Sequence, residues 1–259
     1  MTRPPARRVR HLLDVISVLV MRDQRSRYKS TVFGVLWAVA TPILFLLTFY
    51  VLFQVVLPLN VPNYALHLFI GLIAWTWFQT TVMESVGCIV GNPGLMNQPG
   101  FPRPALPAVA TASNLVTLIL STPLLVAILI GSGTQPGWPV LALPFVLAGQ
   151  FVFVLAAAYF VAALNVTFRD LQYIAPILLQ LGYFLTPIFY DAAALPEGAR
   201  DALALNPLLH FIQAYRDILI RGEWPDWGTI LTVLLLAVLG LALSVAFFRR
   251  ASLRFLEDI

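Results

Sequence analysis

The sequence has few charged residues and almost no cysteine, and each shortage excludes a class of protein. Only 11% of its 259 residues are charged and 59% are hydrophobic, whereas a soluble domain has about 25% charged residues. This composition excludes a disordered chain and most cytosolic enzymes. Cys88 is the single cysteine, so no intrachain disulfide can form and a secreted disulfide scaffold is excluded as well.

The motifs of nucleotide hydrolysis, metal binding and acyl transfer are missing too. A phosphate-binding loop needs a lysine directly after glycine, but the one lysine, Lys29, follows Tyr28. His11, His67 and His210 are far apart, and the sequence contains neither H-E-x-x-H nor G-x-S-x-G. We therefore expect no catalytic residue, no metal and no cofactor in this chain.

Long apolar blocks are abundant. An α-helix needs ~20 residues to cross ~30 Å of hydrocarbon, and backbone polar groups in lipid must be bonded within the chain. The sequence predicts an all-α polytopic membrane protein, with one transmembrane domain over 1–259. Its six transmembrane helices are expected at about 32–57, 66–90, 106–130, 140–164, 173–189 and 229–248. Kinks or breaks are expected at Pro42, Pro123, Pro144, Pro176 and Pro187.

The basic residues predict the orientation of these helices. With the N-terminus in the cytoplasm, thirteen of the sixteen arginine and lysine residues fall in cytoplasmic segments, and Arg200, Arg216 and Arg221 fall outside. Basic residues concentrate on the cytoplasmic side of membrane proteins. Because six spans return the chain to its starting side, both termini are expected in the cytoplasm.

Two segments outside the spans have a helical pattern of their own. The stretch 12–21 forms an apolar arc, with a polar arc roughly opposite that begins at Arg10 and His11, and it lacks a small-residue cleavage site. This predicts an amphipathic interfacial helix and not a signal peptide. The stretch 203–220 is too polar to span and too apolar for an ordinary loop. It predicts a pair of short re-entrant or interfacial helices broken near Asn206 and Pro207; the alternative is a disordered loop.

Glu84 is the one carboxylate well inside a predicted span. Ionisable residues in that position are often functional, and Thr80, Thr81 and Ser85 are close enough in sequence to hydrate it. Glu84 is therefore the proton relay of an ion-driven carrier, a residue of helix pairing, or a residue at the mouth of a pathway.

Four segments, taken together, carry a family resemblance. They are RDQRSRYKSTVFGVLWAVATPIL (22–44), NPGLMNQPGFPRPALPA (92–108), NVTFRDLQYIAPILLQLGYFLTPIFY (165–190) and LALNPLLHFIQAYRDILIRGEWP (203–225). In this order, and in register with six spans, the chain resembles over about 12–248 the ABC-2-type transporter permeases that export lipid-linked polysaccharides such as O antigens, capsules and teichoic acids.

The resemblance implies a half-transporter in the bacterial cytoplasmic (inner) membrane. The permease would form a homodimer and pair with two copies of a separate ATPase that binds ATP and Mg, with no nucleic acid as partner. Residues 8–24 would be the interfacial helix and 195–224 the extracytoplasmic gate segment. The coupling segment, 92–103, would contact the ATPase through Asn92, Pro93, Leu95, Met96, Asn97, Phe101, Pro102 and Arg103.

The first, second and fifth spans would line the translocation path. Sugar rings stack on aromatic side chains and their hydroxyls need hydrogen-bond partners. The candidate path residues are Phe45, Thr48, Phe49, Trp75, Trp77, Gln79, Tyr183, Phe184 and Tyr190; the alternative is that these aromatics only pack helices or form the interfacial belt. Arg22, Arg25, Arg27 and Lys29 lie beside anionic headgroups, where they either bind the diphosphate of a lipid carrier or only enforce topology.

The expected function is that of a permease subunit in an ATP-driven exporter of a lipid-linked surface polysaccharide. An ABC-2 drug or lipid exporter is an alternative, against which the long outer segment and the interfacial helix argue. An ion-driven secondary carrier would depend on Glu84. A membrane-embedded transferase would need convergent carboxylates, and the acidic residues of the outer segment form no evident catalytic motif.

Overall fold

The computed structural model describes residues 5–29, 37–56, 61–192 and 195–252. Every regular element in these residues is helical. Four helices are long and apolar enough to cross a membrane: Tyr64–Gly87, Ala105–Gly131, Trp138–Thr167 and Trp227–Ala251. Ala40–Val56 and Leu171–Leu185 are shorter apolar helices. The all-α prediction is confirmed, and four of the six predicted spans coincide with full-length candidate helices.

The elements follow one another along the chain with short connections. They are α1 (Pro5–Tyr28), α2 (Trp37–Tyr50) with a π-helical extension η2 (Val51–Val56), α3 (Tyr64–Gly87), α4 (Pro93–Met96), α5 (Ala105–Gly131), η3 (Trp138–Ala142), α6 (Leu143–Thr167), α7 (Leu171–Leu185), α8 (Glu197–Ala204), α9 (Pro207–Arg216), η5 (Asp217–Arg221) and α10 (Trp227–Ala251).

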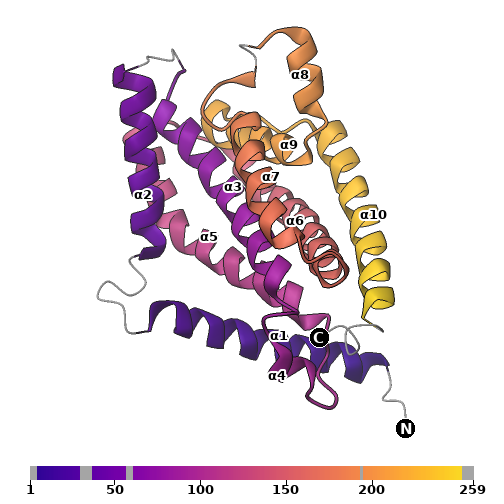
Figure 1. The fold of residues 1–259 in the computed structure, drawn as a ribbon. Helices are drawn as coiled ribbons and strands as arrows, with labels where there is room; N and C mark the ends of the chain where they lie inside the picture. The colour runs from indigo at the N-terminus through magenta and orange to yellow at the C-terminus, as the bar shows by residue number, and fades with distance from the viewer. Residues whose placement is uncertain (1–4, 30–36, 57–60, 193–194, 253–259) are drawn as a thin grey trace.

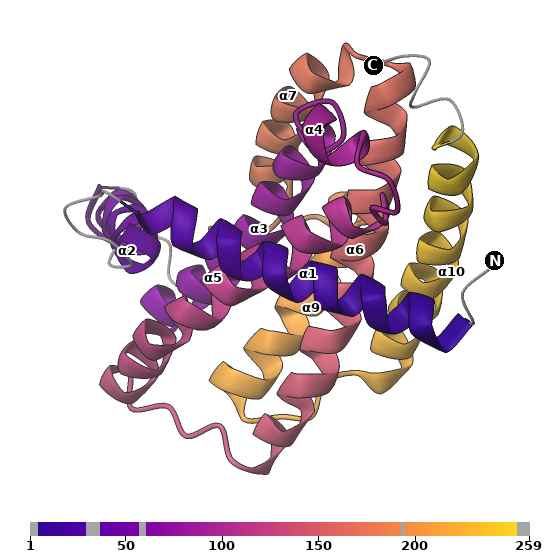
Figure 2. The ribbon, with the colours of Figure 1, turned by 90° about the horizontal axis from the view of Figure 1, so that it is seen from below.

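The helices are arranged as a bundle with a crossing helix at one end (Figure 1). α1 lies across the end of the bundle where α4 lies and where α10 finishes, and α8 and α9 lie at the opposite end. Seen from below, α1 runs over the bundle (Figure 2), where it packs mainly on α5. Nε2 of Gln24 fixes this contact by donating a 2.7 Å hydrogen bond to the Ser113 carbonyl.

α3 is the central helix. It is the least hydropathic of the four long apolar helices and the most deeply buried of them, and it packs against α2, α5, α6, α7 and α9. A helix enclosed by protein can carry polar residues that a lipid-facing helix cannot. α6 and α10 form the most extensive pair of the bundle and leave outward apolar faces such as that of Leu235 and Leu239.

Proline positions explain why the fifth predicted span is helical only as far as residue 185. α2, α5 and α7 continue through Pro42, Pro123 and Pro176, and Pro144 lies in the first turn of α6, where proline is tolerated. α7 instead ends at Leu185 and not at the predicted residue 189. The residue before a proline avoids the helical region, and Thr186, which precedes Pro187, is extended with φ −80° and ψ 131°.

Other predicted boundaries differ by a few residues. α1 is longer than 8–24 at both ends, and the second and last apolar helices begin two residues earlier than expected. Within 92–103 only Pro93–Met96 is helical. Parts of the first predicted span, 32–36 and 57, lie outside the described residues.

The predicted helix pair before the last apolar helix is present. α8 and α9 are separated by Leu205 and Asn206. Asn206 caps α9, because its side-chain oxygen accepts a 3.0 Å hydrogen bond from the backbone N–H of Leu208. Pro207 occupies the first turn, where its missing N–H costs nothing. In the described residues from 195 to 224, the disordered-loop alternative is therefore wrong.

Candidate functional site

An aromatic stripe runs along α2 and η2 toward α7. Phe45, Phe49 and Phe53 follow one another at four-residue spacing, and their rings stack with centroids 6.4 and 6.2 Å apart. Phe49 also packs on Phe189 at 4.4 Å and against the edge of Tyr183 at 6.3 Å. The stripe thus joins α2 to α7 and to the buried segment that follows it.

The same aromatic cluster extends onto α3. The ring of Trp75 lies 5.8 Å from that of Tyr183, and its Nε1–H donates a 2.7 Å hydrogen bond to Oε1 of Gln79. The close approach of α7 requires glycine at 182, since a Cβ there would lie 2.9 Å from the Trp75 ring. Phe49, Trp75, Gln79 and Tyr183, all predicted path residues, therefore come together.

The other predicted path residues lie at the edges of this cluster or away from it. Phe184 is 55% exposed and packs on Tyr183, and the Tyr190 hydroxyl donates to the Leu185 carbonyl at 3.2 Å. Phe45 and Thr48 are exposed. Trp77 faces the other side of α3, where its Nε1–H donates to the Thr111 carbonyl of α5 at 3.3 Å.

Three members of the aromatic cluster were missed by sequence reasoning. Phe53 continues the four-residue spacing of Phe45 and Phe49 and was detectable from that spacing. Phe78 packs edge-on against Trp75 at 5.6 Å. Phe189 enters the cluster only because α7 ends early, so no helical periodicity could have placed it.

Arg27, near the C-terminal end of α1, forms a half-buried ion cluster with residues of α3 and α5. Its Nη2–H donates to Oε2 of Glu84 in α3 at 2.7 Å, and its Nε–H donates to Oδ2 of Asp23 at 2.7 Å. Its Nη1–H donates to Oδ1 of Asn114 in α5 at 3.2 Å. The Asn114 amide donates in turn to Oε2 of Glu84 at 2.9 Å. One guanidinium therefore joins three helices.

The charges of this cluster affect the prediction that Arg27 binds the diphosphate of a lipid carrier. Burial alone would lower the pKa of Arg27, but the hydrogen bonds and charges of Glu84 and Asp23 outweigh it and raise that pKa above its ordinary value. Two carboxylates already face this arginine, so it is a poor ligand for an added diphosphate. Arg22, Arg25 and Lys29, by contrast, are exposed.

The surroundings of Glu84 also differ from the expectation. Thr80 donates to the Thr76 carbonyl at 2.7 Å, and the buried hydroxyls of Thr81 and Ser85 have no partner among the described residues. The groups that bind Glu84 are thus Arg27 and Asn114, on other helices.

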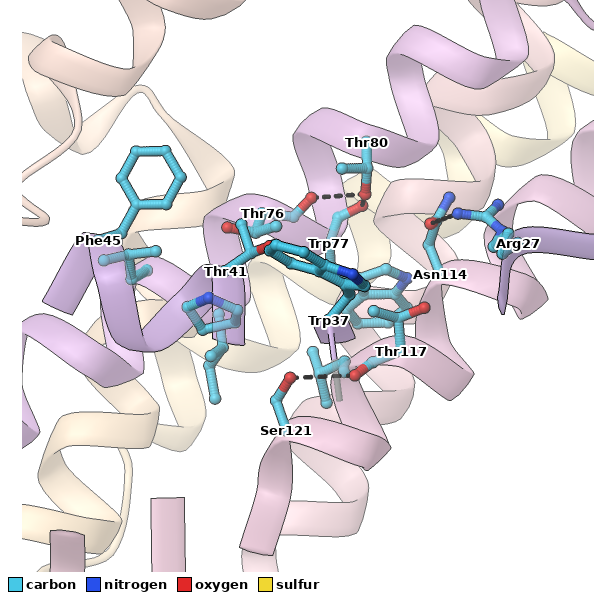
Figure 3. Close-up of a pocket in the computed structure, with 14 residues that line it drawn as sticks. Arg27, Trp37, Thr41, Phe45, Thr76, Trp77, Thr80, Asn114, Thr117 and Ser121 are labelled. Carbon is cyan, nitrogen blue, oxygen red and sulfur yellow. Dashed lines mark hydrogen bonds between the residues drawn. The ribbon is translucent and has the colours of Figure 1, made fainter. Parts of the chain in front are cut away.

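A groove of about 350 Å³ opens beside this cluster, between α2, α3 and α5 (Figure 3). Its walls combine aromatic rings with hydroxyl and amide groups, and Arg27 lies at one end. The hydroxyl of Thr80 is bonded to the Thr76 carbonyl, and that of Ser121 to the Thr117 carbonyl at 3.1 Å. The labelled lining residues are Arg27, Trp37, Thr41, Phe45, Thr76, Trp77, Thr80, Asn114, Thr117 and Ser121.

The predicted coupling segment is held against the bundle by its two ends. Nη1–H of Arg103 donates to the Ser252 carbonyl at 2.6 Å, and the Tyr159 hydroxyl donates to the Pro104 carbonyl at 2.7 Å. Met96 is buried, and the amide of Asn92 donates to the Cys88 carbonyl at 3.0 Å.

Fewer of the predicted contact residues in this segment are exposed than the sequence suggested. Pro93 and Asn97 are exposed, whereas Leu95, Phe101 and Pro102 are half-buried. The sequence prediction omitted Gly94, Gln98, Pro99 and Gly100, which are exposed as well. The tip of the segment is thus built from proline, glycine and amide residues.

Arg216, the last residue of α9, ties this helix to the segment after α7. Its guanidinium is buried and donates to the carbonyls of Pro187 at 2.8 Å, Ile188 at 3.1 Å and His67 at 3.2 Å. The amide of Asn206 donates to the Thr186 hydroxyl at 2.9 Å. Sequence reasoning placed Arg216 only as an outer positive charge, and its binding of carbonyls has no signal in the sequence.

An all-helical bundle with several apolar helices of membrane-spanning length defines a multi-pass membrane protein. The chain belongs to the ABC-2 type transporter family, which matches it over residues 14–220.

Named relatives match nearly the whole chain. An O-antigen export system permease protein RfbA of Myxococcus xanthus is 35% identical over 243 residues, which cover 93% of this chain and 94% of the relative. An O-antigen export system permease protein RfbA of Klebsiella pneumoniae is 30% identical over 251 residues, 95% of each chain. The polysialic acid transport protein KpsM of Escherichia coli is 25% identical over 241 residues, 90% of this chain and 92% of the relative.

Proposed function

We propose that this chain is the permease subunit of an ATP-driven ABC exporter that moves a lipid-linked surface polysaccharide across the bacterial cytoplasmic membrane. The observation that carries the proposal is its match, over more than nine-tenths of its length, to proteins named as O-antigen export permeases. A polysialic acid transport protein matches over nearly the same length, which supports polysaccharide as the substrate class.

Energy for transport would come from a separate subunit. The chain has no lysine in a phosphate-binding loop, so ATP and Mg would be bound by a partner ATPase. We propose a homodimer of this chain with two ATPase copies. The exposed tip of the coupling segment around Asn97 and Gln98 would contact that ATPase.

In the membrane, six elements would cross the bilayer: α2 with η2, α3, α5, α6, α7 and α10. α1 would lie in the inner interface, because it crosses the end of the bundle where α4 lies and where α10 finishes (Figure 1). Both termini would be cytoplasmic, in agreement with the thirteen basic residues assigned to that side. α8 and α9 would form the outer gate as short re-entrant helices.

The polymer would pass along the aromatic cluster of α2, α3 and α7. Ring faces such as those of Phe49 and Tyr183 suit the C–H faces of sugars, and the amide of Gln79 supplies hydrogen bonds for hydroxyls. Among the basic residues, the exposed Arg22, Arg25 and Lys29 suit anionic headgroups or a carrier diphosphate better than Arg27 does, because Arg27 is already paired.

The first experiment is purification from native membranes through a C-terminal tag, with co-purifying chains identified and counted by mass spectrometry. We expect a soluble ATPase with a phosphate-binding loop, present one-to-one with this chain in a four-subunit particle. Recovery of this chain alone, under conditions that preserve a known ABC complex handled in parallel, would contradict the proposal.

A further inference from the structure

α1 is held at its C-terminal end by the ion cluster of Arg27, Asp23, Glu84 and Asn114, which we call the clasp. Arg27 lies one residue before the end of α1 at Tyr28, and the chain then leads to α2, which begins at Trp37. The clasp is therefore close in sequence to the helix that carries the aromatic stripe. Its partners lie on α3 and α5.

From the clasp, α3 leads directly to the coupling segment. Glu84 lies in the last turn of α3, which ends at Gly87. The turn that follows stays bonded to the helix: the Gly91 N–H donates to the Gly87 carbonyl at 2.8 Å, and the Asn92 amide donates to the Cys88 carbonyl at 3.0 Å. A displacement of α4 would therefore move the end of α3 with it.

α1 and the coupling segment face each other across a cleft of about 650 Å³. Arg22 and Ser26 line it from α1, and Asn92 and Leu95 line it from the other side. Open space separates the two walls here, so a push on α4 reaches α1 through the helices on either side of the coupling segment. α5 packs along α1 and bonds Gln24, whereas α3 reaches the C-terminal end of α1 through Glu84 of the clasp.

We propose that the clasp is a mechanical link that carries a displacement of the coupling segment from the end of α3 to the C-terminal end of α1. Arg27 and Glu84 are its positioning residues. The proposal rests on the proposed function, since it assumes an ATPase acting at α4.

The chemistry of the clasp suits a rigid link, one that holds α1 and α3 at a fixed angle to each other. A guanidinium is planar and binds carboxylates through several N–H groups at fixed angles, whereas an ammonium is a point charge on a flexible stem. Arg27 uses three of its N–H groups on three different side chains. The Asn114 amide closes the cluster by bonding Glu84 as well, so rotation of α1 against α3 would break several hydrogen bonds together.

The experiment measures export per ATP hydrolysed in the complete complex, in cells and after purification. Arg27→Gln and Glu84→Gln are each expected to leave complex assembly and ATP hydrolysis in place and to lower export per ATP about tenfold, the size of a coupling of about 1.4 kcal/mol. Because each residue acts through the other, the double variant should lose no more than either single variant. Matched controls on exposed positions of α1, Arg10→Gln and Asp14→Asn, should leave the ratio unchanged.

A charge-exchange variant distinguishes a role of the ion pair in coupling from a role in stability alone. The variant Arg27→Glu with Glu84→Arg places one arginine opposite two carboxylates again and should recover most of the export per ATP. Single variants with an unchanged ratio would overturn the proposal, and so would an exchange variant that assembles without recovering export. Failure of the proposed function would give a different result, since no ATPase would then co-purify with the unaltered chain.

Discussion

The hydroxyl of Tyr215 in α9 donates a 2.8 Å hydrogen bond to Oε1 of Gln150 in α6. Nε2 of Gln150 donates in turn to the Ala74 carbonyl of α3 at 3.0 Å. Gln150 is fully buried, so one amide joins three helices where no water replaces a lost partner. Together with Arg216, it makes α9 part of the helical bundle and not a loosely attached surface helix.

Replacing Tyr215 by phenylalanine should destabilise the protein. The change leaves Oε1 of Gln150 without its donor, and an unsatisfied buried acceptor costs about 1–3 kcal/mol. We expect a lower unfolding temperature of the detergent-solubilised protein. Tyr173→Phe is the control, because Tyr173 is 69% exposed and its replacement should leave the unfolding temperature unchanged. Equal unfolding temperatures for both variants would mean that the Gln150 bond contributes nothing.

Arg216 should not tolerate lysine. The guanidinium bonds the carbonyls of Pro187 and Ile188, which lie beyond the end of α7. A lysine retains the charge but not the planar set of donors, and each buried carbonyl left unpaired costs about 1–3 kcal/mol. We expect Arg216→Lys to lower both the unfolding temperature and export.

The matched control is Arg221→Lys, five residues further along. Arg221 is exposed and pairs with Asp217 at 2.7 Å, and exposed ion pairs contribute about 1 kcal/mol or less. Its replacement should change neither quantity. Wild-type export by Arg216→Lys would show that charge alone is needed at this position.

These two anchors mark the limit of what the sequence predicts. Apolar length predicts the long helices, and the Asn-Pro pair at 206–207 predicts the break between α8 and α9, because both depend on local backbone chemistry. The donors that hold the unwound segment after α7 come from Arg216, nearly thirty residues later in the chain, and no local rule predicts that pairing.

The candidate site shows the same limit. Trp75 and Trp77 are two tryptophans of the same helix, yet only Trp75 faces α7, because a shift of two residues turns a side chain to nearly the opposite face of a helix. Arg27 and Arg25 look equally basic in sequence. Only Arg27 lies where Glu84 and Asn114 from two other helices converge, and that convergence is a property of the packing.

Glycine at 182 should be required for the contact between α7 and α3. A Cβ there would lie 2.9 Å from the ring of Trp75, and that ring is fixed by its bond to Gln79. Overpacking of this kind costs about 1–3 kcal/mol, more than the gain of about 0.5–1 kcal/mol that alanine brings to a helix. We expect Gly182→Ala to lower the unfolding temperature.

Gly87→Ala is the control for this prediction. A Cβ at Gly87 meets nothing within 4 Å, so alanine there should be neutral or slightly stabilising. Equal behaviour of the two variants in thermal unfolding would contradict the tight contact at Trp75.

The tip of the coupling segment should contact the partner ATPase. Gln98 is exposed beside Asn97 and follows α4 by two residues, and α4 lies at the end of the bundle that α1 crosses (Figure 1). Leu205 is 84% exposed at the opposite end, between α8 and α9. In a Cys88→Ser background, a cysteine at position 98, labelled with a maleimide that carries a photoactivatable group, should cross-link to the ATPase on illumination. The same label at position 205 should not, because the bilayer would separate it from a cytoplasmic partner. Cross-linking from position 205, or none from position 98 in an assembled complex, would place the ATPase elsewhere on the permease.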